Sequence, residues 1–169
     1  MRGLLIREAK KDEVHLLKEQ RFAAYQSFQK ELSPKQWERL ESNLAFASNS
    51  PSGMEVFVAE IGWEIVGSVA LLSSGSTICT EKQKLSEYPE ICLLAVAPEF
   101  RSRGVGKALI EHCIDMSKIR KQQSIRLYTG CFMKNAIDLY EKMGFTHVAS
   151  LDFKPLDDDF TVSAFHLDI

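Results

Sequence analysis

The first third of the chain alternates apolar and polar positions in a way that predicts one strand and two helices. Residues 4–10 carry the short apolar run of a strand. A helix is expected from Asp12, which suits an N-cap, to residue 28. Its apolar members follow a helical spacing: Val14, Leu17, Phe22, Tyr25 and Phe28. Ser33 can cap a second helix, over residues 33–46, that has Pro34 at its first position.

Two strands joined by a tight turn follow. Residues 54–61 and 64–72 are both rich in β-branched and apolar residues, and only Gly62 and Trp63 separate them. A two-residue connection of this kind predicts an antiparallel hairpin. Residues 73–89 are polar and show no sustained period, so they are expected to form a loop.

A nearly continuous apolar run at residues 90–98, ended by Pro98, is typical of a central strand buried on both faces. A helical pattern at about 104–120 and a strand pattern at 124–129 come next. A strand, a helix and a strand in this order require a crossover connection. The two strands are therefore expected to be parallel neighbours in a right-handed unit.

The end of the chain predicts one more helix and two more strands. The helix covers residues 133–143 and stops before Gly144, which suits the position just past a helix end. A strand is expected at 145–153, a turn at the acidic residues 157–159, and a closing strand at 160–169. The predicted fold is α/β, with a mixed central β-sheet, an antiparallel N-terminal half, a parallel crossover and about four flanking helices.

Length and composition narrow the class of protein. At 169 residues, one domain over residues 1–169 is expected. The net charge of −2 provides no overall field for binding nucleic acid or an anionic membrane. The four cysteines and four histidines show neither a disulfide framework nor the spacing of a metal site. Without a signal peptide or an apolar run that could span a membrane, the sequence predicts a cytoplasmic protein.

Candidate chemistry lies at the junction between the central strand and the following helix, in the segment RSRGVGK. Gly104 and Gly106 open the helix, where the first N–H groups lack intrahelical partners and the helix dipole is positive. Such a terminus binds anions, and glycine allows a phosphate to approach the backbone closely. Arg101, Arg103 and Lys107 add positive charge, so the combination suits a diphosphate.

Two common phosphate-binding loops do not fit this segment. A Walker A loop requires glycine where Arg101 stands, and serine or threonine where Ala108 stands. A dinucleotide fingerprint requires glycine at the position of Leu109. Both readings are therefore excluded, and with them a nucleotide-phosphate binder.

A third motif matches. The order R-x-x-G-x-G, directly after LLAVAP, resembles the acetyl-coenzyme A motif of the Gcn5-related N-acetyltransferase (GNAT) family. A second segment, AIDLYEKMGF at residues 136–145, resembles the C-terminal motif of that family. The resemblance covers residues 54–150, and the ends only by the order of elements. It implies a GNAT-like fold and an enzyme that transfers an acetyl group from acetyl-coenzyme A (acetyl-CoA), a co-substrate, to a primary amine.

The same resemblance implies where acetyl-CoA binds. In the family, the strand before the motif splays from its neighbour and pairs with the pantetheine arm, which implicates Leu94, Ala95 and Val96. The pyrophosphate is expected at the backbone amides of residues 102–107, so that these amides matter more than most of the side chains. This set comprises Ser102, Arg103, Gly104, Val105, Gly106 and Lys107, with Arg101 just before it.

One position departs from the family pattern. An asparagine usually stands seven residues before the motif tyrosine, where this chain has Met133. Asn135 is offset by two positions, which is about 200° around a helix. Asn135 is a candidate contact for the cofactor, and Met133 is the alternative contact for the pantetheine arm.

Two residues are candidates for proton transfer. Tyr140 matches the general acid of the family, a phenol that protonates the departing thiolate; the alternative is a tyrosine packed in the core. Glu90, at the start of the central strand, is the candidate base for the amine proton, and the alternative is a solvated strand-edge glutamate. Glu87 and Tyr88 are lesser candidates for that base.

Several points stay open from the sequence. Tyr25, Phe28 and Trp37 shape an acceptor groove or pack in the core, and helical spacing does not separate the two. The acceptor can be a small amine or a protein N-terminus. A catalytically inactive CoA-binding regulatory module is the alternative function. No metal, nucleic acid or membrane partner is expected, and a homodimer through the C-terminal strand is compatible with the family.

Overall fold

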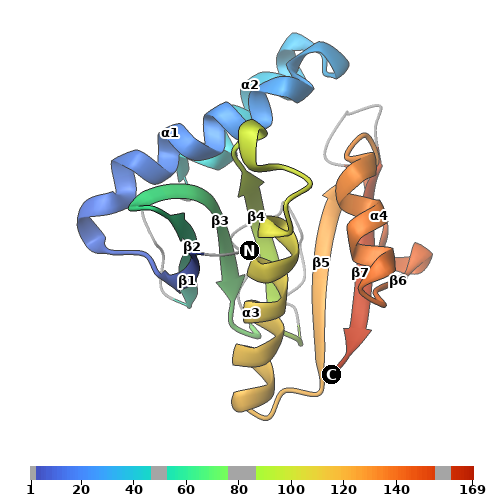
Figure 1. Ribbon diagram of the computed structural model, residues 1–169. Coiled ribbons are helices and arrows are strands. Elements are labelled where there is room, and N and C mark those ends of the chain that lie inside the picture. Colours follow the sequence, from blue (N-terminus) through green and yellow to red (C-terminus); the bar gives the residue numbers. More distant parts are fainter. Residues whose placement is uncertain (1–2, 47–52, 76–86, 155–160) are drawn as a thin grey trace.

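The protein, seen here in a computed structural model, is described over residues 3–46, 53–75, 87–154 and 161–169. These residues form a twisted sheet with helices on both faces (Figure 1). Its seven strands lie in the order β1-β2-β3-β4-β5-β7-β6. Their bounds are Leu4–Glu8, Met54–Ile61, Glu64–Leu72, Glu90–Val96, Ser124–Gly130, Thr146–His147 and Val162–Asp168 for β1 to β7.

The mixed character of the sheet agrees with the prediction. β4 and β5 pair in parallel, and the other neighbouring pairs are antiparallel. The hairpin of β2 and β3 turns at Gly62 and Trp63, which both have positive φ, as a two-residue hairpin turn requires. The final strand β7 lies between β5 and β6, an order that the sequence did not indicate.

Four α-helices cover the two faces of the sheet. They are α1 (Val14–Tyr25), α2 (Pro34–Phe46), α3 (Val105–Ile119) and α4 (Lys134–Lys142). The period of two along β2 separates two cores, because Phe57 packs with the residues of α3 whereas Val58 packs with Leu17 of α1. α3 and Tyr140 of α4 therefore share one face, and α1 lies on the other. No helix among the described residues is long and apolar enough to cross a membrane.

The face that α1 turns inward differs from the prediction. Its buried residues are Leu17, Arg21, Ala24 and Tyr25, whereas Phe22 is 39% exposed. These four buried positions recur at intervals of three and four and make a better helical stripe than one through Phe22. The sequence pattern missed this stripe because one member is an arginine.

The two N-terminal helices begin differently. At α2 the predicted cap is confirmed: the amide of Gln36 donates to Ser33 Oγ at 3.2 Å, and Gln36 Oε1 accepts from the amide of Ser33 at 2.8 Å. Asp12 does not cap α1. It lies in a 3-10 turn, Lys11–Glu13, and the Glu13 carboxylate accepts the amide of Lys10 at 2.8 Å.

Near the C-terminus the expected strand over 145–153 is much shorter. Only Thr146–His147 pairs as β6, followed by a 3-10 turn at Ala149–Leu151 and an isolated bridge at Phe153. The Asp152 carboxylate binds His147 and the amide of Ala164, so a side chain replaces part of the missing ladder. Gly144 ends α4 with φ 95°, as predicted, while the expected turn at 157–159 lies outside the described residues.

The cysteines of the described residues occur in two states, one in a disulfide and two as free thiols. Cys92 on β4 is disulfide-bonded, which the spacing did not predict. Cys113 is a buried free thiol in the core under α3, and Cys131 is an exposed one.

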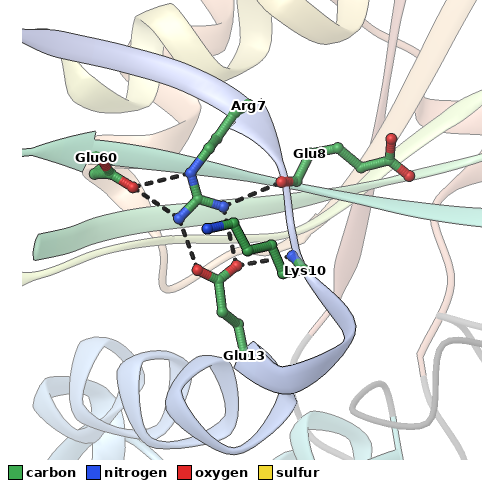
Figure 2. A network of polar contacts seen from close by, with 5 residues as sticks. All are labelled: Arg7, Glu8, Lys10, Glu13 and Glu60. Atoms are coloured by element: carbon green, nitrogen blue, oxygen red, sulfur yellow. Dashed lines mark hydrogen bonds and ion pairs between the residues drawn. The ribbon is translucent and has the colours of Figure 1, made fainter. Parts of the chain in front are cut away.

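An ion-pair network fixes the start of α1 against the sheet edge (Figure 2). Arg7 of β1 binds Glu13 with Nη2 at 2.7 Å, and it binds Glu60 of β2 with Nε at 2.9 Å and Nη2 at 2.7 Å. All three side chains are mostly buried. The hydrogen bonds from Arg7 hold the pKa of Glu13 at about 2.

We expect Arg7→Met to lower the free energy of unfolding by about 2–4 kcal/mol, because it leaves two shielded carboxylates without their cation. The depressed pKa of Glu13 stabilises the fold fully above pH 4.5, and this stabilisation is lost as pH falls toward 2. Wild type should therefore lose stability over this range more steeply than the variant. Urea unfolding at a series of pH values measures both effects.

The control is Arg120→Met, which breaks the more exposed pair between Arg120 and Glu55. It should lower the free energy of unfolding by at most ~1 kcal/mol. Equal losses in the two variants would contradict a special role of the Arg7 network.

Candidate active site

The central feature of the site is a gap in the sheet between β4 and β5. These strands pair only at Glu90 with Arg126 and at Ile91 with Leu127. Beyond this point they diverge, as Figure 1 shows, although β4 stays paired to β3 and β5 to β7. The edge of β4 from residue 92 onward therefore has no neighbouring strand on its β5 side. The predicted splay of this strand is present.

A distortion of β4 lies at the start of the gap. Leu93 has φ 55°, and the register against β3 shifts between Ser68 and Ala70. A positive φ is unfavourable for a residue with a branched side chain, and bulges of this kind re-aim backbone groups beside active sites. The backbone that follows Leu93 is thereby turned relative to a regular strand.

A cleft of about 460 Å³ opens at the gap. Its walls come from α1 and the turn after it, from the end of β4, from the loop into α3, and from α4. The lining residues are Ala24, Tyr25, Phe28, Leu94, Ala95, Val96, Phe100, Arg101, Ser102, Gly104, Gly106, Lys107, Met133, Asn135, Ala136, Asp138, Leu139 and Lys142.

The predicted cofactor residues lie together at this cleft, apart from Arg103 and Val105. Arg103 is exposed and lies over the ring of Phe100, 5.3 Å from its centroid. The Val105 side chain is 1% exposed in the core, so only its backbone can face the cleft. Met133 and Asn135, the two alternatives at the start of α4, both line it.

The N-terminus of α3 is open toward the cleft. The first helical hydrogen bond runs from the amide of Ala108 to the carbonyl of Gly104, so the three preceding amides have no acceptor within the helix. Gly104 and Ser102 adopt the left-handed conformation, with φ 82° and 60°, which turns the chain sharply into the helix. A Cβ on Gly106 would lie 3.4 Å from Leu139 Cδ2 and 3.6 Å from Val96 Cγ2.

The side chain of Arg101 points toward α1. Nη2 donates to the carbonyl of Ala24 at 2.5 Å, Nη1 to Ser27 Oγ at 3.4 Å, and Nε to the carbonyl of Val96 at 3.3 Å. Arg101 thus joins the end of β4 to the end of α1. Of the cations that line the cleft, Lys107 is exposed and 3.6 Å from Glu111, and Lys142 is also exposed.

Two residues of α1 bind the carbonyls just before that of Val96. The hydroxyl of Tyr25 donates to the carbonyl of Leu94 at 2.8 Å, and Gln20 Nε2 donates to the carbonyl of Ala95 at 3.3 Å. Three successive carbonyls at the end of β4 therefore accept side-chain hydrogen bonds. Tyr25 lines the cleft and is buried, so it belongs both to the groove and to the core.

Tyr140 lies on α4 and is 5% exposed. Its ring packs against Phe145 and Phe165, with centroids 6.0 and 6.1 Å away. Burial raises the pKa of Tyr140 well above its ordinary value, and Tyr25 adds to the rise, so the phenol stays protonated at neutral pH. Tyr140 is thus a protonated tyrosine packed in the core, and it is not among the residues that line the cleft.

Glu90 is not a solvated residue, because it is only 2% exposed. It begins β4, four residues before Leu94, which is about 13 Å along a strand. It is not among the residues that line the cleft. Of the lesser candidates, Glu87 is exposed, and the Tyr88 ring packs against Arg126, whose guanidinium carbon lies 4.4 Å from the ring centroid.

Beyond Asn135, the sequence did not indicate which residues of α4 line the cleft. Ala136, Asp138, Leu139 and Lys142 lie on one side of this helix, at the spacing of three and four that faces a common surface. The sequence shows this spacing, but the spacing alone does not tell whether that side of the helix faces a cleft or solvent. Among the residues that the structure describes, no group of three or more His, Cys, Asp or Glu could hold a metal ion.

Comparison with known proteins agrees with this geometry. The family model described as an acetyltransferase (GNAT) domain matches residues 52–147, more than half of the chain. The chain belongs to the GNAT acetyltransferase family. The GNAT resemblance inferred from the two motifs is therefore confirmed.

The curated relatives of this GNAT protein are longer proteins. An uncharacterised N-acetyltransferase of Methanocaldococcus jannaschii is 33% identical over 83% of the chain and 59% of its own length. N-acetyltransferase 8 of Rattus norvegicus is 30% identical over 57% of the chain and 41% of its own length. The chain thus spans less than two thirds of these relatives.

Solved structures share the fold at low sequence identity. A GNAT-family acetyltransferase of Staphylococcus aureus has a TM-score of 0.72, with 16% identity and 98% of both chains covered. A ribosomal-protein-alanine N-acetyltransferase of Brucella melitensis has a TM-score of 0.67, with 18% identity over 98% of this chain and 99% of that one. The predicted α/β fold with a mixed sheet is confirmed.

The anion cradle, formed by the free amides of residues 105–107 at the start of α3, can be tested with larger side chains at position 106. We expect Gly106→Val to raise the Kd for coenzyme A at least tenfold, because a branched side chain between Val96 and Leu139 blocks the approach to the backbone amides. Gly106→Ala adds a single carbon at ordinary contact distance and should change the Kd by less than about threefold. Calorimetric titration gives both values. Equal Kd values for Gly106→Val and wild type would remove the cradle assignment.

Proposed function

We propose that residues 1–169 form one acetyltransferase domain that transfers an acetyl group from acetyl-CoA to a primary amine by direct attack. The observation that carries the proposal is the cleft in which the unpaired edge of β4 meets the open N-terminus of α3. An extended arm with amide groups can pair with the edge of β4, and a diphosphate can bind the N-terminus of α3. The GNAT family supports this assignment.

The residues present fit the parts of acetyl-CoA. The amides of residues 105–107 would hold the pyrophosphate, and a side chain larger than that of alanine at position 106 would close the space over them. Leu94, Ala95 and Val96 offer backbone groups to the pantetheine arm, and Met133 adds an apolar wall. When bound, acetyl-CoA supplies the acetyl group as a reactive thioester. Asn135 is an additional contact.

The chain's own groups then provide the proton transfers. As the amine nitrogen bonds to the acetyl carbon and the carbon–sulfur bond breaks, Tyr140 donates its proton to sulfur. Glu90 accepts the proton that the amine loses, through intervening water, since it lies at the far end of β4. A backbone amide near the bulge at Leu93 polarises the acetyl oxygen. This assigns Tyr140 as general acid and Glu90 as base.

We expect Tyr140→Phe to lower kcat for thiol release about 100-fold or more, because a general acid contributes a factor of this order. The Kd for coenzyme A should change less than threefold, since the ring and its packing against Phe145 and Phe165 are kept. Thiol release with a panel of amines and calorimetry measure the two quantities. The matched control is Tyr128→Phe, whose ring packs against Phe153 outside the cleft, and it should retain wild-type kcat.

Three outcomes distinguish the possibilities. Undiminished kcat in Tyr140→Phe would remove the general-acid role and leave the enzyme. Thermal stabilisation by acetyl-CoA without thiol release from any amine would favour a CoA-binding regulatory module. The absence of any stabilisation by acetyl-CoA would contradict both functions.

A further inference from the structure

Within the part of the chain that the structure covers, Arg21 is a buried cation without a counter-charge. It lies on α1 and is 1% exposed, one of the most deeply buried large side chains in the described part of the chain. Its Nε, Nη1 and Nη2 atoms are all shielded from solvent, and none has a hydrogen-bond partner among the residues that the structure describes. A guanidinium carries five N–H donors and keeps its charge in proteins. Five unsatisfied donors on a buried cation form an unfavourable arrangement for a folded chain.

Arg21 is not itself among the residues that line the cleft, but it lies on the stretch of α1 that packs over the distorted part of β4. Leu17 and Ala24, four residues before and three after it on the same side of α1, belong to separate buried clusters, and Leu93 packs against both. Leu93 is the distorted residue of β4 at which the gap begins. The stretch of α1 that holds Arg21 therefore covers the bulge.

A second observation ties Arg21 to the cleft wall. Burial raises the pKa of Tyr25 to about 12, and the charges of Arg21 and Arg101 oppose this rise. Tyr25 follows Arg21 by four residues on α1, so the two side chains are neighbours on one side of the helix. The Tyr25 hydroxyl contacts the carbonyl of Leu94, and Tyr25 lines the cleft. Arg101 has three acceptors of its own, whereas Arg21 has none among the described residues.

We propose that Arg21 binds a carboxylate of the acceptor, so that the substrate is a molecule that carries both an amine and a carboxylate, as an amino acid does. This rests on the proposed function, because it names the class of the amine. The planar fork of a guanidinium matches a carboxylate with two parallel hydrogen bonds. A single negative charge neutralises Arg21, while Leu17, one turn away on α1, and the apolar cluster around it disfavour a more strongly hydrated dianion.

A binding arginine and a structural arginine differ in how their removal changes the stability of the free protein. A buried cation that holds the fold would destabilise the protein when removed, whereas an unpaired one destabilises the protein by its presence. Arg21→Met keeps the length of the side chain and removes the charge. The melting temperature of the free protein should therefore stay the same or rise.

The experiment compares wild type, Arg21→Met and Arg21→Lys with sets of three related amines. Each set contains an amino acid, its amide and the amine without the carboxyl group. Additional compounds are peptides with free or amidated C-termini, and phosphoethanolamine. In wild type, the KM of the preferred carboxylate should be at least tenfold below that of its amide. Arg21→Met should remove this difference with little change for the amide, and Arg21→Lys should restore part of it.

Lys18→Met is the matched control, because Lys18 is an exposed cation on the same helix. It should keep the preference for the carboxylate. The same compounds are tested by thermal shift in the presence of coenzyme A, which reports binding without turnover. Arg21→Gln repeats the series with a polar group in place of the methionine thioether.

The results separate this inference from the function on which it rests. Stabilisation by carboxylates that depends on Arg21, without thiol release from any amine, would support the carboxylate site and contradict the enzyme. Thiol release with no preference for carboxylates, or with a preference that survives Arg21→Met and Arg21→Gln, would overturn the role of Arg21. A lowered melting temperature in both variants, or a preference for phosphoethanolamine, would overturn it as well.

Discussion

The missing hydrogen bonds between β4 and β5 are the constraint on which the rest of the structure depends. Backbone N–H and C=O groups away from water need partners, and a sheet that opens in its middle leaves them without any. Here Tyr25, Gln20 and Arg101 bind the carbonyls of Leu94, Ala95 and Val96 from outside the sheet. The gap persists because side chains replace a strand, and the remaining edge is where an extended ligand can pair.

These side-chain hydrogen bonds to the carbonyls of β4 require α1 to lie in a fixed position over that strand. At its start, the network of Arg7, Glu13 and Glu60 holds it to the sheet edge. At its end, Arg101 binds the carbonyl of Ala24. The antiparallel half of the sheet, which contributes no residue to the lining of the cleft, therefore positions the wall of the cleft through a helix.

The sequence predicts those elements that are determined by neighbouring residues, and it fails for those that depend on distant segments. The β2–β3 hairpin, the cap at Ser33 and the glycine opening of α3 were predictable, because each is determined by a few adjacent residues. The place of β7 and the shortening of the 145–153 strand were not, since they depend on pairing between segments far apart in the chain. The cleft was predicted on its β4 and α3 sides from motif residues, and helical spacing left Tyr25 open between groove and core, whereas Asp138 and Lys142 carry no local mark of a site.

The two arginines near the end of α1 show why burial cannot be inferred from residue type. Both appear in the sequence as surface charges, yet Arg101 binds three acceptors and Arg21 binds none among the described residues. Arg101 is an exposed residue whose donors are engaged, whereas the buried Arg21 breaks the rule that buried polar groups are satisfied. Folding alone gives no reason to place a cation at position 21, where methionine or leucine would pack without any unsatisfied donor. We therefore explain Arg21 by what it binds rather than by what it packs against.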